Sequence, residues 1–543
     1  MDNRIANLAR GHWPFILVLA AYWLSVICLV VYSMQLTEGN LIYALDDSYI
    51  HMSMAKNAAV HGVWGVTRYG FSSSTSSPLW TLLLAINYVL FGVNNLSPLL
   101  LNLFFASLTV LLSYRYLKQN INSPFTVFLI LLAAVFAAPL PALTLVGMEH
   151  ILHLYLSLGF LILAVKNVIN ENYRIDKSFR LLFACSALLA MVRYEGLFII
   201  FMICAVLLVR RKRIHAVLLG AAGLMPVLFY GLWSMANGWY FFPNSLLLKA
   251  QLPNSSHTGL LEELGRGAIR VLHSEKCCLF LLIAALLLII VHSIKKPRTN
   301  DSAKYALVIY SGSLLLHLQF ASTGWFFRYE AYLIYLGIII ISITVKEYLT
   351  WQHINSIVND KFLHKAAFTC LFIFLCYPYI IRSTSSLWGA PKASRNIYDQ
   401  QYQMGLFLRQ YFEYKACALN DIGAATYLAD IQLVDLFGLG SLESARLKLN
   451  NNFTTSEIHN LTYQKHVQVA VVYDSWFRHE TKAGIPQEWI RVGRWRIPEN
   501  VICGDDTIAF YAVEPSEAES LKRNLKQFRS LLPMDVQHIE ENR

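Results

Sequence analysis

Long apolar runs of roughly 15 to 22 residues recur along the first 384 residues of the chain, and a run of this length is typical of a bilayer-spanning helix. Polar and charged residues separate the runs. The apolar runs lie at 13–34, 96–117, 124–140, 149–166, 179–192, 195–209, 214–235, 277–294, 303–320, 329–346 and 366–384. The pattern therefore predicts a polytopic α-helical membrane protein with about 11 transmembrane helices.

Two places in this pattern leave alternatives. The runs 179–192 and 195–209 are short and are separated only by Arg193-Tyr194-Glu195, so one long helix through the region is the alternative to two spans. The run 78–92 is as apolar as a span but begins at Pro78 and is short. We interpret it as a re-entrant or interfacial helix in the outer leaflet.

The pattern changes at about residue 385, where short alternating runs replace the long apolar ones. Strands are predicted at 415–421, 430–436, 467–474 and 507–513, and helices near 398–414 and 516–532. The chain is therefore expected to contain a membrane domain over 1–384 and a small α/β domain over 385–543. Within the second domain, Cys417 and Cys503 lie beside predicted strands. They can either form a disulfide with each other or remain free thiols, and the two alternatives are equally favoured.

Composition and charge support the membrane class. Hydrophobic residues make up 56% of the chain, charged residues 15%, and the mean hydropathy is +0.44. The formal net charge is +11, but residues 385–543 hold 17 Lys and Arg against 19 Asp and Glu, so the basic excess belongs to the membrane domain. It lies there mainly in short loops, which argues against nucleic-acid binding.

The loop charges also select an orientation. With the N-terminus in the cytoplasm, the cytoplasmic segments hold 19 Lys and Arg and the opposite loops hold 8. The positive-inside rule favours this arrangement. We therefore expect a multi-pass protein of the inner (plasma) membrane with a cytoplasmic N-terminus and an extracytoplasmic C-terminal domain.

In this topology the polar residues at span ends gather on the outer face. Placing ionisable groups at the ends of membrane spans costs free energy, so their convergence on one face predicts a polar site there. The candidate residues are Asp46, Asp47, His51, Arg68, Glu149, Arg193, Glu195, Asn244, Lys249, Arg328 and Glu330. Simpler roles compete: the two Arg-Tyr-Glu triplets can be ion pairs that fix helix ends, and Lys249 can extend to the interface. No metal site is predicted, because no further ligand completes the group of Glu149, His150 and His153.

Several short motifs occur in an order that resembles a known family. They are DDSYIHMSMAKNAAVHG from Asp46, TSSPLW from Thr75, VGMEH from Val146, VRYEG from Val192, FPNSLLLK from Phe242, RYE from Arg328, NDIGA from Asn420 and DLFGLG from Asp435. The sequence resembles the GT-C fold glycosyltransferases, most closely the bacterial branch that includes the terminal β-arabinofuranosyltransferase. Related first loops often carry an arginine where this chain has His51-Met52-Ser53-Met54, so the resemblance does not fix the sugar.

The resemblance implies transfer of a sugar, with a pentose such as arabinofuranose among the candidates, from a polyprenyl-phosphate donor. The acceptor would be an envelope glycan or glycolipid, in lipopolysaccharide or arabinan biosynthesis. An essential first-loop aspartate of the family corresponds to Asp46 or Asp47, either of which can act as the base in an inverting displacement.

The remaining candidates have supporting roles in this reaction. Arg193, Lys249 and Arg328 would bind the donor phosphate, and His51, Arg68, Glu149, Glu195, Asn244 and Glu330 would contact sugar or acceptor. No cofactor is required, although a divalent cation near the carboxylates is compatible with the chemistry.

Two other classes of function fit the same composition. A transporter or channel with an outer cap would place its site near the bilayer midplane between repeated halves, and the sequence shows no internal repeat. A non-catalytic envelope scaffold would keep the helices without the chemistry, and mutation of the aspartates distinguishes it from an enzyme.

Overall fold

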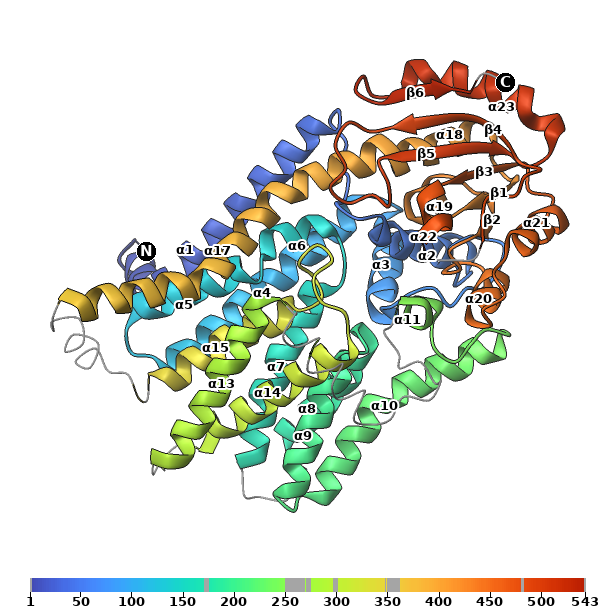
Figure 1. Ribbon diagram of the computed structural model, residues 1–543. Coiled ribbons are helices and arrows are strands. Elements are labelled where there is room, and N and C mark those ends of the chain that lie inside the picture. The colour runs from blue at the N-terminus through green and yellow to red at the C-terminus, as the bar shows by residue number, and fades with distance from the viewer. Residues whose placement is uncertain are drawn as a thin grey trace.

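The computed structural model describes residues 2–169, 175–249, 269, 275–295, 301–346, 348, 362–479 and 483–541. Its larger part is a helical bundle, with a small α/β domain at one end (Figure 1). The bundle contains α1 (Asp2–Leu36), α2 (Asp46–His61), α3 (Pro78–Phe91), α4 (Leu96–Asn120), α5 (Pro124–Ala137), α6 (Leu140–Val146), α7 (His150–Ile169), α8 (Lys177–Val192), α9 (Gly196–Val209), α10 (Arg213–Ala236), α11 (Asn244–Lys249), α13 (Lys276–Lys295), α14 (Asp301–Phe320), α15 (Ala331–Val345) and α17 (Phe362–Ile397).

All eleven predicted spans are helical. Among the described residues, seven helical stretches are long and apolar enough to cross a membrane, and they contain α1, α4, α5 with α6, α7, α10, α13 and α17. The remaining predicted spans correspond to α8, α9, α14 and α15. The apolar run that begins at Pro78 is the helix α3, whose N-terminus is capped by Ser77 through a hydrogen bond from the Trp80 amide.

The region from 179 to 209 is two helices rather than one. Arg193 is extended, with φ −156° and ψ 140°, and interrupts the helical backbone between α8 and α9. The Lys212 ammonium after α9 donates to the Asn167 carbonyl, and the Asn167 amide donates to Ser178 at the start of α8. The far ends of α8 and α9 therefore meet, so the two helices form an antiparallel hairpin, as the two-span prediction requires.

Hydrogen bonds and ion pairs show which helix ends lie together at each of the two ends of the bundle. At one end, Tyr114 contacts the Gly11 carbonyl, and Lys346 donates to the Asn120 carbonyl. At the other end, Arg193 pairs with Glu149. The second end also carries α2, α11 and the C-terminal domain (Figure 1). The predicted site residues Arg193 and Glu149 therefore lie at the end of the bundle that carries the C-terminal domain.

The C-terminal domain, here called the cap, is built on one mixed sheet of order β2-β1-β3-β5-β4-β6. The first three strands are parallel, and β5, β4 and β6 are antiparallel to their neighbours. The strands are β1 (Ala416–Leu419), β2 (Gln432–Asp435), β3 (Val469–Val472), β4 (Ile490–Arg496), β5 (Thr507–Ala512) and β6 (Gln537–Glu540). The cap helices are α18 (Gln403–Tyr411), α19 (Gly423–Leu428), α20 (Leu442–Leu449), α21 (Thr455–Gln464), α22 (Asp474–His479) and α23 (Ala518–Phe528).

All four predicted strands and both predicted helices of this domain are present. The prediction omitted two strands. In β4 three arginines lie among the apolar residues, and β6 is a short edge strand without buried residues. The predicted boundary at 385 lies inside α17, which continues through a π-helical turn at Tyr398–Tyr402 into α18. Cys417 and Cys503 are both free thiols, so the disulfide alternative is wrong.

Candidate active site

The aspartate pair opens α2 and faces the cap. Leu45 precedes the helix and offers no side-chain cap, so the two carboxylates occupy the first turn, where the helix dipole stabilises negative charge. Asp46 is buried and accepts two hydrogen bonds from the N-terminus of α19, one from the Gly423 amide at 2.6 Å and one from the Ala424 amide at 2.7 Å. Asp46 therefore fixes the cap to the membrane domain.

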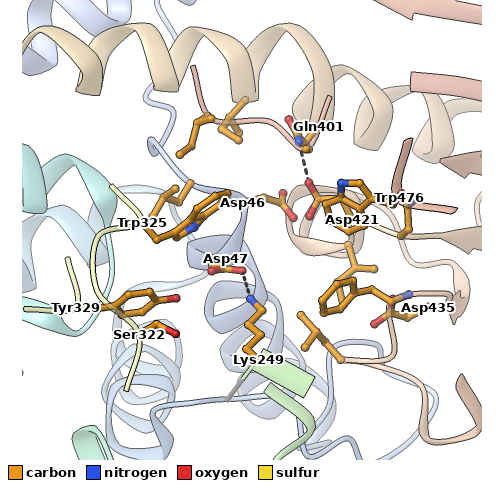
Figure 2. Close-up of a pocket in the computed structure, with 18 of the residues that line it drawn as sticks. Asp46, Asp47, Lys249, Ser322, Trp325, Tyr329, Gln401, Asp421, Asp435 and Trp476 are labelled. Carbon is orange, nitrogen blue, oxygen red and sulfur yellow. Dashed lines mark hydrogen bonds and ion pairs between the residues drawn. The ribbon is translucent and has the colours of Figure 1, made fainter. Parts of the chain in front are cut away.

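Asp47 points the other way, into a cavity, where Figure 2 shows it in contact with Lys249, and it also pairs with Arg328. Its carboxylate lies 3.0 Å from the Lys249 ammonium and 2.6 Å from the Arg328 guanidinium. Burial alone would raise the pKa of Asp47, but the charges of Lys249 and Arg328 hold it well below its ordinary value. Asp47 is therefore an ionised carboxylate in the unliganded protein.

Arg328 is held by a strained loop between α14 and α15. Trp325, Phe326 and Phe327 have φ of 36°, 60° and 62°, a conformation that costs side-chain-bearing residues about 1–3 kcal/mol each. The loop is fixed by the Glu330 carboxylate, which accepts from the Gly324 amide at 2.8 Å and pairs with Arg382 at 2.5 Å. Glu330 is fully buried, so the structure places this predicted sugar ligand under the loop as a support.

Asp421 of the cap is a site residue that the sequence prediction omitted, although its motif NDIGA was recognised. Its carboxyl group lies beside Asp46 and accepts from the Gln401 amide at 2.8 Å. Burial and the charge of Asp46 raise the pKa of Asp421 well above its ordinary value. Ionisation of Asp421 is therefore disfavoured next to Asp46, at the junction of the two domains. Only the position of Asp421 after β1, at the same sheet edge as other motif residues, could have identified it.

Arg193 lies at the centre of a second buried cluster. It binds Glu195 through two nitrogens, at 2.5 and 3.0 Å, and Glu149 at 2.6 Å. His51 lies 3.6 Å from Glu149 and hydrogen-bonds to Thr81. Because two carboxylates already neutralise Arg193, this cluster offers a phosphate less charge than Lys249 and Arg328 do.

Two further predicted residues hold the domains together. The Asn244 side chain is buried and donates to the Gly438 carbonyl of the cap at 2.8 Å. Arg68 lies 3.8 Å from Asp430, which Lys56 also contacts at 3.2 Å. Lys56 also donates to a carbonyl in the last turn of α19. The helix α2 therefore places a carboxylate, Asp46, at the N-terminus of α19 and an ammonium group, Lys56, at its C-terminus, which is the arrangement that the helix dipole favours. Neither Asn244 nor Arg68 lines the two cavities described next.

Two cavities meet at Asp47, Lys249 and Tyr329. The cap cavity, of about 630 Å³, lies between the cap and the membrane domain and is lined by Asp46, Asp421, Asp435, Trp325 and Trp476 among others (Figure 2). The membrane cavity, of about 290 Å³, lies within the bundle and is lined by Arg193, Arg328, Glu195, His51 and apolar side chains.

A third, apolar cavity of about 530 Å³ adjoins the membrane cavity at Tyr194. Tyr194 lines both spaces. The apolar cavity is otherwise bounded by side chains of α3, α8 and α10 and of the segment after α2, including Trp64, Pro78, Leu82, Met225 and Trp233. Tyr194 therefore stands between the membrane cavity, which Asp47 lines, and an apolar space beside α3.

The roles of the two aspartates can be separated by mutation. In Asp46→Asn, one of the two acceptors for the α19 amides becomes an NH₂ group, and a charge-assisted hydrogen bond contributes about 1.5–3 kcal/mol. We expect amide exchange at Gly423 and Ala424 to accelerate at least tenfold by hydrogen-exchange mass spectrometry. The control Asp506→Asn removes a cap carboxylate that pairs with Arg496 and should leave this exchange unchanged. Wild-type exchange in Asp46→Asn would show that Asp46 does not fix the cap.

Comparison with known proteins identifies the fold. The structure is similar to ArnT from Cupriavidus metallidurans bound to undecaprenyl phosphate, with a TM-score of 0.53 and 12% identity over 91% of this chain and 98% of that chain. The apo state of the same protein gives a TM-score of 0.54 and 12% identity over 94% and 99%. A family model described as a domain of unknown function (DUF8728) matches residues 395–511, and no curated protein matches. The chain therefore has the GT-C fold of polytopic membrane enzymes, with a small C-terminal α/β domain.

Proposed function

We propose that the protein is a membrane glycosyltransferase that moves a sugar from a polyprenyl-phosphate donor to a glycan or glycolipid acceptor. The observation that carries this proposal is the position of Asp47, in the wall common to two cavities and in contact with Lys249 and Arg328. A transferase requires donor and acceptor spaces that meet at one reactive group. Similarity to a protein that binds undecaprenyl phosphate supports a lipid-linked donor.

The donor fits the membrane cavity and its apolar extension. Lys249 and Arg328 provide the positive charge for a phosphate, and Arg presents a planar fork that matches phosphate oxygens. The polyprenyl chain would pass Tyr194 into the apolar cavity beside α3. This places the tail near α3, the helix interpreted from the sequence as re-entrant.

The reaction follows from this arrangement. The bond between the anomeric carbon and the phosphate oxygen breaks through an oxocarbenium-like state, and Lys249 and Arg328 stabilise the departing phosphate. Asp47 accepts the proton of the attacking acceptor hydroxyl. A bound phosphate competes with Asp47 for the same two cations, so donor binding raises the low pKa of this carboxylate toward that of a base. A single displacement inverts the anomeric centre.

The other candidate residues have supporting roles in this proposal. Asp46 and Asn244 fix the cap, Glu330 fixes the loop that carries Arg328, and the Arg193 cluster orients the donor sugar through Glu195 and His51. The site faces away from the cytoplasm, as the loop charges indicate, in the inner (plasma) membrane. A monophosphate donor needs no cofactor. Arabinofuranose remains one candidate for the transferred sugar.

The proposal is tested by mass spectrometry of envelope glycans and glycolipids from cells with and without the gene. Loss of the protein should remove one sugar from one acceptor, leave the lipid-linked donor in excess, and be reversed by the wild-type gene. Unchanged glycans with an altered distribution of a solute across the membrane would favour a transporter. Rescue by an Asp47→Asn gene would favour a scaffold.

A further inference from the structure

The cap cavity and the membrane cavity differ in the charged side chains that line them. Among the described residues that line the cap cavity, four are acidic, namely Asp46, Asp47, Asp421 and Asp435, and one is basic, Lys249. The described lining of the membrane cavity holds Arg193, Lys249 and Arg328 against two acids, Asp47 and Glu195. A phosphate is therefore favoured in the membrane cavity and disfavoured in the cap cavity.

The cap side of the cavity is the carboxyl edge of three parallel strands. Asp421 follows β1, Phe437 follows β2 and Trp476 follows β3, and all three line the cavity. Ligands of open α/β sheets bind outside the carboxyl ends of parallel strands, where loops from neighbouring strands converge. The topology of the cap thus directs a binding surface toward Asp47.

Aromatic side chains face this cavity from both domains. Figure 2 shows Trp325 and Tyr329 on the membrane-domain side and Trp476 on the cap side. The Trp476 ring packs at 5.3 Å from Phe437, and a Cβ added at Gly504 would lie 2.6 Å from its indole nitrogen, so close packing fixes the ring. Trp325 is 53% exposed, although it lies in the strained loop that Glu330 and Arg382 fix. An exposed indole that the protein holds in a costly conformation indicates a ligand contact.

We propose that the cap cavity binds an uncharged sugar portion of the acceptor, with Trp325 on one wall and Trp476 on the other, which deepens the proposed transferase function and rests on it. The C–H faces of a sugar ring stack on indole faces, while its hydroxyl groups hydrogen-bond to polar groups at the edge of the cavity. Both oxygens of Asp435 already accept backbone amides, whereas Asp421 accepts from Gln401 at Oδ2, so Oδ1 of Asp421 is the cap carboxyl oxygen best placed for such a bond. The excess of carboxylates excludes acceptor rings that carry phosphate or carboxylate groups.

The experiment uses the full chain in lipid nanodiscs and two separate binding measurements. The first titrates undecaprenyl phosphate. The second measures binding to an array of neutral arabinan, galactan, mannan and glucan fragments and to phosphorylated and uronic-acid-containing oligosaccharides. The variants are Trp325→Ala and Trp476→Ala, with Trp388→Ala as the matched control, because Trp388 is exposed on α17 and lines neither cavity.

We expect neutral fragments to bind, and each cavity variant to weaken that binding at least tenfold with undecaprenyl phosphate binding unchanged. Trp388→Ala should bind like the wild type. Because Trp325 is largely exposed, its variant tests the proposal even if Trp476→Ala fails to fold. Preference for anionic oligosaccharides, retention of neutral binding in Trp325→Ala, or no binding to any array member would overturn the proposal. Failure of the wild type to bind undecaprenyl phosphate would instead refute the donor side of the proposed function.

Discussion

Asp47→Asn is expected to lower the transfer rate by about 10²–10⁴-fold, the usual contribution of a positioned general base. The asparagine keeps the shape of the side chain and its contact with Lys249, but it cannot take a proton from the acceptor hydroxyl. Donor binding should be retained or strengthened, since the substitution removes the carboxylate that competes with phosphate for Lys249 and Arg328. Steady-state transfer and separate titration of undecaprenyl phosphate measure the two effects.

The matched control is Asp430→Asn. Asp430 also lies where the two domains meet, but it pairs with Lys56 and lines neither cavity. Its variant should transfer sugar within about threefold of the wild type, because a part-exposed ion pair contributes only about 1 kcal/mol or less. Full activity of Asp47→Asn would remove this aspartate from the chemistry.

Arg328→Ala is expected to reduce kcat/KM by about 10²-fold or more, because it removes a cation aimed at the departing phosphate. Arg328→Lys should recover little of this loss. Arg328 also donates to Met148 and Tyr329, and the shorter reach of an ammonium group cannot reproduce that geometry. Titration of undecaprenyl phosphate should show weaker binding in both variants, which separates a phosphate contact from an effect on the acceptor.

Arg68→Ala serves as the control for charge at the same end of the bundle. Arg68 was a candidate from the sequence, but its guanidinium is directed to Asp430 and lies outside both cavities. We expect Arg68→Ala to transfer sugar at nearly the wild-type rate. Together with the loss in Arg328→Ala, this result would show that the lower rate depends on the position of the arginine and not on the net charge at this end of the bundle. Equal losses in the two variants would contradict the assignment.

The helices and their sorting into two ends were predictable, because apolar length and loop charge are local properties of the sequence. The charged interruption at Arg193 was enough to indicate two helices where one was the alternative. The strand β4 was missed because three arginines interrupt its apolar residues, and β6 was missed because it is short and has no buried residue.

The sequence indicated which polar residues gather at one end of the bundle, but not the contacts that each of them makes. Asp46 and Asp47 are adjacent in sequence, yet one binds cap amides and the other binds cations, and only the position of α19 decides between them. Likewise, Arg193 and Arg328 occur in identical triplets. Glu195 binds its own arginine, whereas Glu330 turns away to Arg382 and leaves Arg328 for Asp47. Such differences arise from tertiary contacts that no local pattern records.

The most direct measurement is a cryo-electron microscopy map of the full chain in nanodiscs with bound undecaprenyl phosphate. The account predicts phosphate density within hydrogen-bonding distance of Lys249 and Arg328, next to Asp47, with the polyprenyl chain passing Tyr194 toward α3. Phosphate density at the opposite end of the bundle, near Lys118 and Lys346, would contradict it.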